Sequence, residues 1–395
     1  MLLQIVLAAV IFASPTLAQE LELDFDSFDF DDDFEIIIED TPAPTSLDLS
    51  AVVGLSYSGI GVLDESWTAQ FNISNEHNFG SLGFLEWAGN VALNDDDMSL
   101  NLTRIHLQNS AGDFSWKLGK YRIGWGEIEG TPVLDILNSA LSFGSGLGGD
   151  ELPGQWFAGL DYFPNSMTIS SFVGVAPEVA HSTPTDSSTD VEIGIKAEIP
   201  TVSGSVSFYA AQLIPQSGVV DINADTSHAE PYILTGISAN HSIGSVLLEI
   251  DVAGKFGLQR STDLALSEHS RIDAAIGLEY AASNTMQITA AVTAEHWLEQ
   301  SQNYFLPDGF LSPQTTANYI LGVSETLMEG KLSVSANMLG ALNNTANVAA
   351  VSASYAYSEK LEFGASAMWM NIEAGTPLES MDGFKQFGLT STFHF

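Results

Sequence analysis

Charged residues of opposite sign gather in one stretch of this chain of 395 residues. Four of its 11 Lys and Arg residues, Arg104, Lys117, Lys120 and Arg122, fall within 19 residues. The acids that follow are Glu127, Glu129, Asp135, Asp150 and Glu151. On opposite sides of a narrow aqueous passage, the two clusters would create a transverse field that sorts ions by sign. They could equally form salt bridges that tie one segment to another, and the two roles are compatible.

Catalytic chemistry has little support in the sequence. The chain has no cysteine, which excludes a thiolate nucleophile and a Cys-based zinc site. Its eight histidines stand in no recognisable nucleophile or metal-ligand spacing. We therefore expect no enzyme, no cofactor and no resident metal.

The elements that must position the charged residues are β-strands. From Ile272 to Tyr280, and again from Met286 to Ala294, apolar residues occupy every second position, and the other positions are polar, charged or small. Such period-2 runs recur from residue 49 to residue 395 and predict about 18 strands (16–18), each with one apolar face. Between Leu102 and Ile105 the apolar parity shifts, which indicates a bulge or an exit from the membrane. Without one of these, the four bases cannot all share a face.

The connections between the predicted strands fall into two classes. Those after even-numbered strands are short, such as Pro164–Asn165 and Ser358–Glu359. Those after odd-numbered strands are often long, namely 123–152, 176–189, 214–230, 255–269, 298–315 and 373–383. Short turns on one rim and long loops on the other are typical of a barrel lying across an outer membrane.

The C-terminal segment, T-S-T-F-H-F, resembles the last strand of bacterial outer-membrane β-barrel proteins, which typically ends in an aromatic residue read by the assembly machinery. Phe393 and Phe395 match that pattern. Closure of the sheet also has a physical reason, because an open edge in lipid leaves backbone N–H and C=O groups without partners. The resemblance implies a transmembrane antiparallel β-barrel.

The long connection after the fifth predicted strand resembles, through R-x-x-W-G-E…D-x-x-N, a family of poorly characterised porin-like outer-membrane barrels. The matching residues are Arg122, Trp125, Gly126, Glu127, Asp135 and Asn138. The family's next proline is replaced by Ser139. In general porins, which this arrangement also resembles, the corresponding loop folds into the lumen and narrows it. The resemblance therefore implies that this loop narrows the pore. The predicted constriction residues are Arg104, Lys117, Lys120, Arg122, Glu127, Glu129 and Asp135.

Acidic residues dominate the polar parity of the later strands. The predicted lumen acids are Glu192, Glu198, Glu249, Asp251, Asp273, Glu279 and Glu295. Rings of carboxylates favour cations in a water-filled pore, so the sequence predicts cation preference. The alternative is that a net charge of −39 reflects general adaptation to salt. Either way, nucleic acid is disfavoured as a partner.

The N-terminus divides into two segments before the barrel. Residues 1–19 combine an apolar run with a small-residue segment ending at Ala18, which predicts a signal peptide. Residues 20–48 form an acidic, Phe-rich tail that we expect to be disordered and periplasmic. Residues 49–395 form the predicted all-β barrel.

Together these features predict a porin-like channel of the bacterial outer membrane for passive diffusion of small hydrophilic solutes, with a preference for cations. The expected partners are outer-membrane lipid, the barrel assembly machinery acting through Phe395, small solutes and cations, and a homotrimer is left open. The alternative is a barrel that anchors a periplasmic export or assembly complex through the acidic tail.

Overall fold

The structure is a computed structural model whose description covers residues 46–94, 97–128, 131–134, 136–137, 154–176, 191–215, 219–221, 226–262, 266–299, 304–305, 313–342, 346–373 and 379–395. Predictions for residues 1–45, which include the signal peptide and nearly all of the acidic tail, lie outside these residues. β1 begins at Ser46, three residues before the predicted start of the barrel. Within the described residues, no helix is long and apolar enough to cross a membrane.

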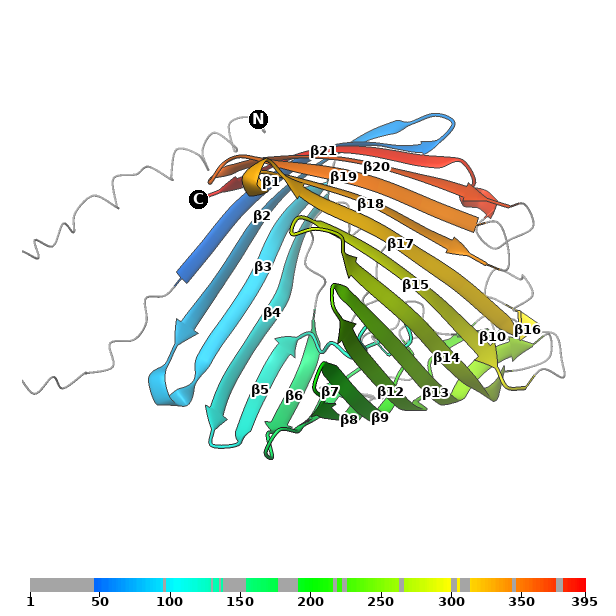
Figure 1. Ribbon diagram of the computed structural model, residues 1–395. Coiled ribbons are helices and arrows are strands. Elements are labelled where there is room, and N and C mark those ends of the chain that lie inside the picture. Colours follow the sequence, from blue (N-terminus) through cyan, green and yellow to red (C-terminus); the bar gives the residue numbers. More distant parts are fainter. Residues whose placement is uncertain are drawn as a thin grey trace, which may run out of the picture.

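Eighteen strands of the described residues form the barrel wall (Figure 1). The first nine are β1 (Ser46–Ile60), β2 (Asp64–Asn78), β3 (Phe84–Asn94), β4 (Asp97–Ala111), β5 (Phe114–Tyr121), β6 (Gln155–Tyr162), β7 (Thr168–Val175), β8 (Val191–Pro200) and β9 (Gly204–Leu213). The other nine are β12 (Tyr232–Ile243), β13 (Val246–Thr262), β14 (Leu266–Ala281), β15 (Met286–Trp297), β17 (Thr315–Leu327), β18 (Leu332–Ala341), β19 (Ala346–Ser358), β20 (Leu361–Ile372) and β21 (Phe384–His394). The predicted strand number is confirmed.

Shorter elements decorate this wall. β10 (Val219–Asp221) and β11 (Thr226–His228) form a separate hairpin, and β16 (Tyr304–Phe305) pairs with the end of β13. Three 3₁₀ turns, η2 (Gly80–Leu82), η3 (Met328–Gly330) and η4 (Glu379–Met381), lie in connections between strands.

Every wall strand pairs antiparallel with its neighbour, and the sheet closes through β1 and β21. The closing register runs from Ser50 opposite His394 to Ile60 opposite Phe384. Because every wall strand has a partner on both sides, backbone hydrogen bonds are satisfied within the sheet, as a spanning barrel requires.

The two faces of the wall differ as the alternation predicts. Large apolar side chains such as Val53, Phe71, Ile193 and Leu321 are exposed on one face. Residues paired across antiparallel strands share a face, so the register places polar and small residues together on the other. In a closed barrel the exposed apolar face is the outer one and the polar face lines the interior.

Two local features of the wall refine the sequence interpretation. The register between β3 and β4 shifts where Ala88 and Gly89 oppose Arg104 and Leu102, which leaves Thr103 as an extra residue. This bulge is the one indicated by the parity shift. The prediction of a long connection at 255–269 is wrong, because β13 continues to Thr262 and β14 begins at Leu266. A second bulge between Phe256 and Leu258 carries these strands past the break in their apolar pattern.

Candidate functional site

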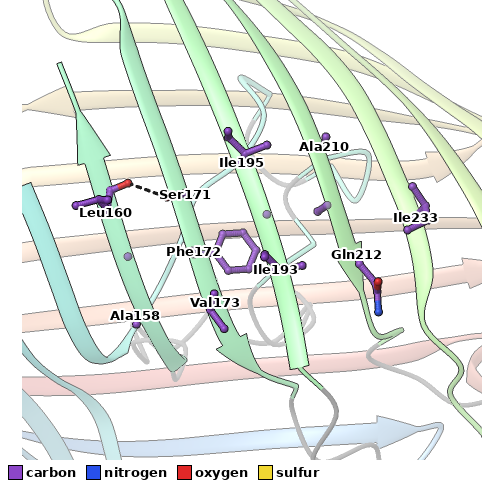
Figure 2. A pocket seen from close by; sticks show the side chains of 13 residues that line it. Ala158, Leu160, Ser171, Phe172, Val173, Ile193, Ile195, Ala210, Gln212 and Ile233 are labelled. Atoms are coloured by element: carbon purple, nitrogen blue, oxygen red, sulfur yellow. Dashed lines mark hydrogen bonds between the residues drawn. The ribbon is translucent and has the colours of Figure 1, made fainter. Parts of the chain in front are cut away.

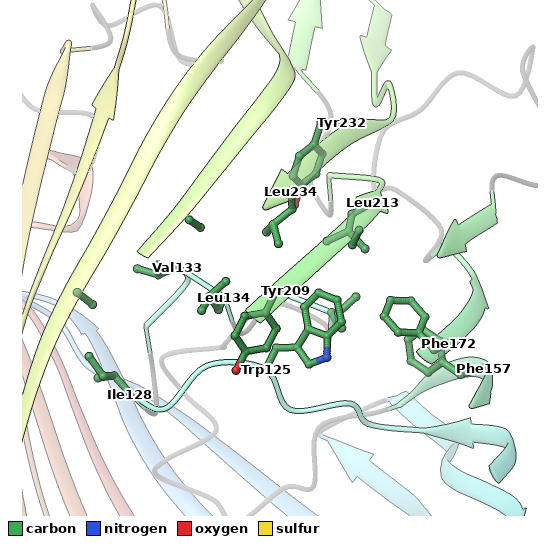
Figure 3. Packing of buried hydrophobic residues seen from close by; sticks show 14 of the residues in the cluster. Trp125, Ile128, Val133, Leu134, Phe157, Phe172, Tyr209, Leu213, Tyr232 and Leu234 are labelled. Carbon is green, nitrogen blue, oxygen red and sulfur yellow. The ribbon is translucent and has the colours of Figure 1, made fainter. Parts of the chain in front are cut away.

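The described part of the connection after β5 lies against the inner face of the wall. Trp125, which is 3% exposed, packs against the rings of Phe172 on β7 and Tyr209 on β9, with centroid separations of 5.4 and 5.2 Å (Figure 3). Gly194 on β8 leaves room for the indole, since a Cβ built there would lie 2.7 Å from Trp125. The tryptophan of the W-G-E motif therefore anchors the connection to three strands.

Position 126 requires glycine because of both its backbone angle and its surroundings. Its φ is +87°, in the region that favours glycine, and a Cβ would lie 2.8 Å from Oδ2 of Asp251. The close approach lets the next two amides donate to that carboxylate: Glu127 N lies 3.0 and 3.2 Å from its two oxygens, and Ile128 N lies 3.2 Å from Oδ2. Asp251 on β13 is 1% exposed, and its buried carboxylate holds the backbone of the turn.

The Glu127 side chain makes a second contact with the wall. Its Oε2 accepts from Asn240 Nδ2 at 2.6 Å, and its Oε1 accepts from Ser238 Oγ at 3.2 Å. Ser238 also lies 2.8 Å from the hydroxyl of Tyr209. We call the contacts of Gly126, Glu127 and Ile128 with Asp251, Ser238 and Asn240 the latch.

Aliphatic side chains complete the attachment of the connection. Val133, Leu134 and Leu137 are at most 2% exposed and belong to one buried cluster with the inner faces of β5–β7, β9 and β12–β15. A Cβ on Gly236 of β12 would lie 2.5 Å from Leu134 Cδ2, so glycine makes room in the wall here. Figure 3 shows Leu134 between Val133 and Tyr209. Part of the lumen is thus filled with an apolar core.

A buried network of charges lies beside this core. Lys255 Nζ contacts Asp273 Oδ2 at 2.6 Å and donates to the carbonyl oxygen of Pro132 at 3.0 Å. Arg271 bridges Asp273 at 2.7 Å and Glu295 at 2.9 Å. The side chains of Lys255 and Asp273 are 4% and 0% exposed. The network therefore ties β13, β14 and β15 to the connection.

The four bases of the first charged cluster take different places. Arg104 points inward and pairs with Glu86 at 2.6 Å, and Lys117 Nζ lies 4.7 Å from the centre of the Tyr121 ring. Lys120 has the outward parity of the exposed Leu118 and donates to the carbonyl of Leu102 at 2.6 Å. The bulge changes which residues of β4 face inward, but it does not change which residues of β5 do so. Lys120 is therefore placed away from the predicted constriction.

Of the remaining residues of the predicted constriction, only some lie within the described residues. Arg122 is exposed at the start of the connection. Glu127 lies in the latch. Glu129 and Asp135 lie outside the described residues.

The seven predicted lumen acids all have inward parity, but they differ in exposure. Glu192, Glu249, Asp251 and Asp273 are between 0% and 7% exposed, and Glu192 accepts a hydrogen bond from the backbone N of Ile214 at 3.0 Å. Glu198 pairs with Lys196 at 2.8 Å, Glu295 pairs with Arg271, and Glu279 accepts from Gln287 at 2.9 Å. Most of these carboxylates therefore hold protein groups in this structure and do not form a bare ring around water.

The rest of the inner wall has a different chemistry. We call the inward-facing side chains of β17–β21, β1 and β2 the hydroxyl wall, because Ser, Thr, Asn and Gln predominate there. Its side chains bond to one another: Ser335 to Ser352 at 2.7 Å, Ser56 to Ser66 at 2.6 Å. None of its described polar side chains is buried. The described part of the connection therefore leaves this half of the lumen uncovered.

A hollow on the described surface lies on the other side of the wall. It has a volume of about 690 Å³ and is lined by outward residues that include Leu160, Val173, Ile193 and Ala210 (Figure 2). Ser171 there donates its hydroxyl to the carbonyl of Leu160 at 3.3 Å, which satisfies a polar group on an apolar face. This hollow suits lipid and is separate from the interior.

Sequence reasoning missed the wall residues that receive the connection, chiefly Phe172, Tyr209, Ser238 and Asn240. Their inward parity was readable, but nothing local marks them as partners of a segment 47 to 113 residues away. Among the described residues, no group of three or more His, Asp or Glu side chains could hold a metal ion.

These features define a class: a closed 18-strand antiparallel barrel with an apolar outer face, a polar interior and an inward-packed connection after β5. Solved outer-membrane porins share this fold. OccK2 (OpdF) from Pseudomonas aeruginosa, solved in complex with glucuronate, is similar with a TM-score of 0.58 and 14% identity, over 89% of this chain and 96% of that one. A BenF-like porin from Pseudomonas fluorescens Pf-5 gives 0.58 and 12%, over 89% and 99%. OprD from Pseudomonas aeruginosa gives 0.55 and 13%, over 88% and 95%.

At these identities the similarity establishes the fold alone. No family model matches the chain, and neither does any curated protein.

Proposed function

We propose that the chain is a porin of the bacterial outer membrane that lets small hydrophilic solutes diffuse passively. The observation that carries the proposal is the uncovered hydroxyl wall inside a closed barrel whose outer face is apolar. Eighteen strands give a lumen wide enough for an aqueous channel. The described part of the inward-packed connection reduces that lumen without filling the side lined by the hydroxyl wall.

Single-channel recording of the refolded protein in a planar bilayer tests this function. We expect stepwise conductance increments that heat-denatured protein does not produce. A correctly folded barrel, shown by strand-rich circular dichroism, that conducts no ions would overturn the proposal.

The preference for cations belongs to the same proposal, with narrower support than the sequence suggested. Glu198 is partly exposed and compensates the charge of Lys196 beside the lumen, whereas Glu192 is buried away from passing ions. Glu192 and Glu198 lie on the same face of β8 and form a matched pair. We expect Glu198→Gln to shift the reversal potential under a KCl gradient toward chloride, and Glu192→Gln to leave it unchanged. Chloride carrying most of the current in the unmodified protein would refute the preference.

The orientation and the partners are proposals as well. We place the N-terminus in the periplasm, so that the long connections face outward, and we assign recognition by the assembly machinery to the strand that ends at Phe395. Labelling of single cysteines introduced at Gly244 and at Val219 in intact cells tests the orientation, because the two lie at opposite ends of the wall strands. Reaction at Gly244 alone would contradict it. Crosslinking in membranes tests whether three barrels associate.

A further inference from the structure

The inner wall is divided between two chemistries. From β5 to β15 the interior holds the apolar core, the latch and the buried ion network. From β17 through β21 to β2 it holds the hydroxyl wall, where the described buried side chains, Met368 and Ile372, lie toward one end of β20. A solute that passes through the described part of the barrel therefore passes the hydroxyl wall and the adjoining inner faces of β3 and β4, where Glu86 pairs with Arg104.

The hydroxyl wall carries almost no charge. Its inward positions contain no Lys or Arg among the described residues. Its carboxylates, Asp48, Asp64, Glu76 and Glu362, each lie within three residues of a strand end. The middle of the wall is therefore lined by neutral donors and acceptors such as Asn337, Ser352 and Thr390.

Four of the inward bases elsewhere have acids beside them, whereas Lys117 lies over the ring of Tyr121. Arg104 pairs with Glu86, Lys196 with Glu198, and Lys255 and Arg271 with Asp273. A base held by a carboxylate presents little net field to a passing anion. The described hydroxyl wall thus offers anions no positively charged side chain along its inward face.

Resting on the porin function proposed above, we propose that the channel serves uncharged polyhydroxylated solutes, such as sugars and polyols. Hydroxyl and amide groups on the wall can exchange hydrogen bonds with the hydroxyls of such a solute in place of water. A charged solute gains no fixed countercharge at mid-wall to offset its partly lost hydration.

Flux of three solutes of similar size tests the solute class. Proteoliposomes of the full mature chain take up labelled glucose, glucosamine or gluconate, with the membrane potential collapsed. We expect glucose to enter about two- to threefold faster than either charged analogue. Glucosamine or gluconate entering as fast as glucose would overturn the inference.

Two substitutions at one position test the path. Ser352 lies on β19, paired with Ser335 and Ser366. We expect Ser352→Lys to raise the ratio of gluconate to glucosamine flux by about fivefold, and Ser352→Gln, of similar length, to leave that ratio unchanged. An unchanged ratio in the lysine variant would mean that solutes do not pass this wall.

The two proposals fail in different ways. If no solute enters faster than it enters empty liposomes, the porin function itself is wrong. If solutes enter but the charged analogues match or exceed glucose, the channel stands and the solute class is wrong.

Discussion

The loop-covered half of the barrel interior and the hydroxyl wall are built from the same alternating strands but use their inward positions differently. In the covered half, Asp251, Lys255 and Asp273 are buried and engaged with the connection after β5 or with one another. In the hydroxyl wall, Ser56, Ser66, Ser335 and Ser352 bond in pairs across neighbouring strands. Among the described residues, the buried ionic groups serve attachment, and mainly neutral polar groups line the middle of the uncovered wall.

The largest expected effect comes from breaking the buried ion network. Asp273→Ala leaves Lys255 and Arg271 without the carboxylate they share, which should lower the free energy of unfolding by about 3–5 kcal/mol. Urea unfolding of the refolded barrel measures this. The control is Glu362→Ala, an acid of the hydroxyl wall, whose midpoint should stay close to that of the unmodified protein. Equal losses in the two variants would show that the halves do not differ in how they use charge.

The second-largest effect should come from breaking the latch, which should change the conductance more than it changes the stability of the barrel. Asp251→Ala removes the acceptor for the amides of Glu127 and Ile128, at a cost of about 1–3 kcal/mol. The freed connection should make single-channel currents noisier and change the mean conductance. Currents that match the unmodified protein would mean that the apolar core alone holds the connection.

Alanine at Gly126 and at a matched glycine separates the effect of backbone strain from the effect of crowding by the added Cβ. Gly126→Ala should cost about 1–2 kcal/mol through its positive φ, plus the effect of a Cβ pressed against Asp251. Gly61 is a matched control, since its φ is +77° and a Cβ there meets nothing within 4 Å. We expect increased current noise for Gly126→Ala and not for Gly61→Ala. Equal noise in both variants would mean that the close approach to Asp251 is unimportant.

The smallest effect should fall on the hydroxyl wall. Ser335→Ala removes the hydrogen bond to Ser352 at a partly exposed site, and the change in unfolding free energy should stay within about 0.5 kcal/mol. The same urea titration detects it. A loss of unfolding free energy similar to that of Asp251→Ala would show that the hydrogen bonds of this wall also stabilise the barrel.

The strands were predictable because alternation is local. The run from Ile272 to Tyr280 shows its two faces without any knowledge of its neighbours, and the parity shift after Leu102 marked the bulge. The roles of the inward acids were not predictable in this way. Asp251 and Asp273 have the same parity and charge as Glu279, yet burial by a segment more than 100 residues away gives them a different role. The motif W-G-E identified the connection, but its partners Tyr209 and Asn240 depend on the three-dimensional path.

The pairing of β1 with β21 has a consequence for how the molecule is made. Until Phe384–His394 is in place, the edge of β1 has no partner, and the two strands are separated by nearly the whole described chain. The sheet therefore closes at the junction of β1 with β21, and the pairing of these two strands is the last to form. A rearranged chain that joins β21 to β1 through a short linker and opens at the turn Glu359–Lys360 would convert this late, distant contact into a local hairpin, and should complete its sheet at a different place.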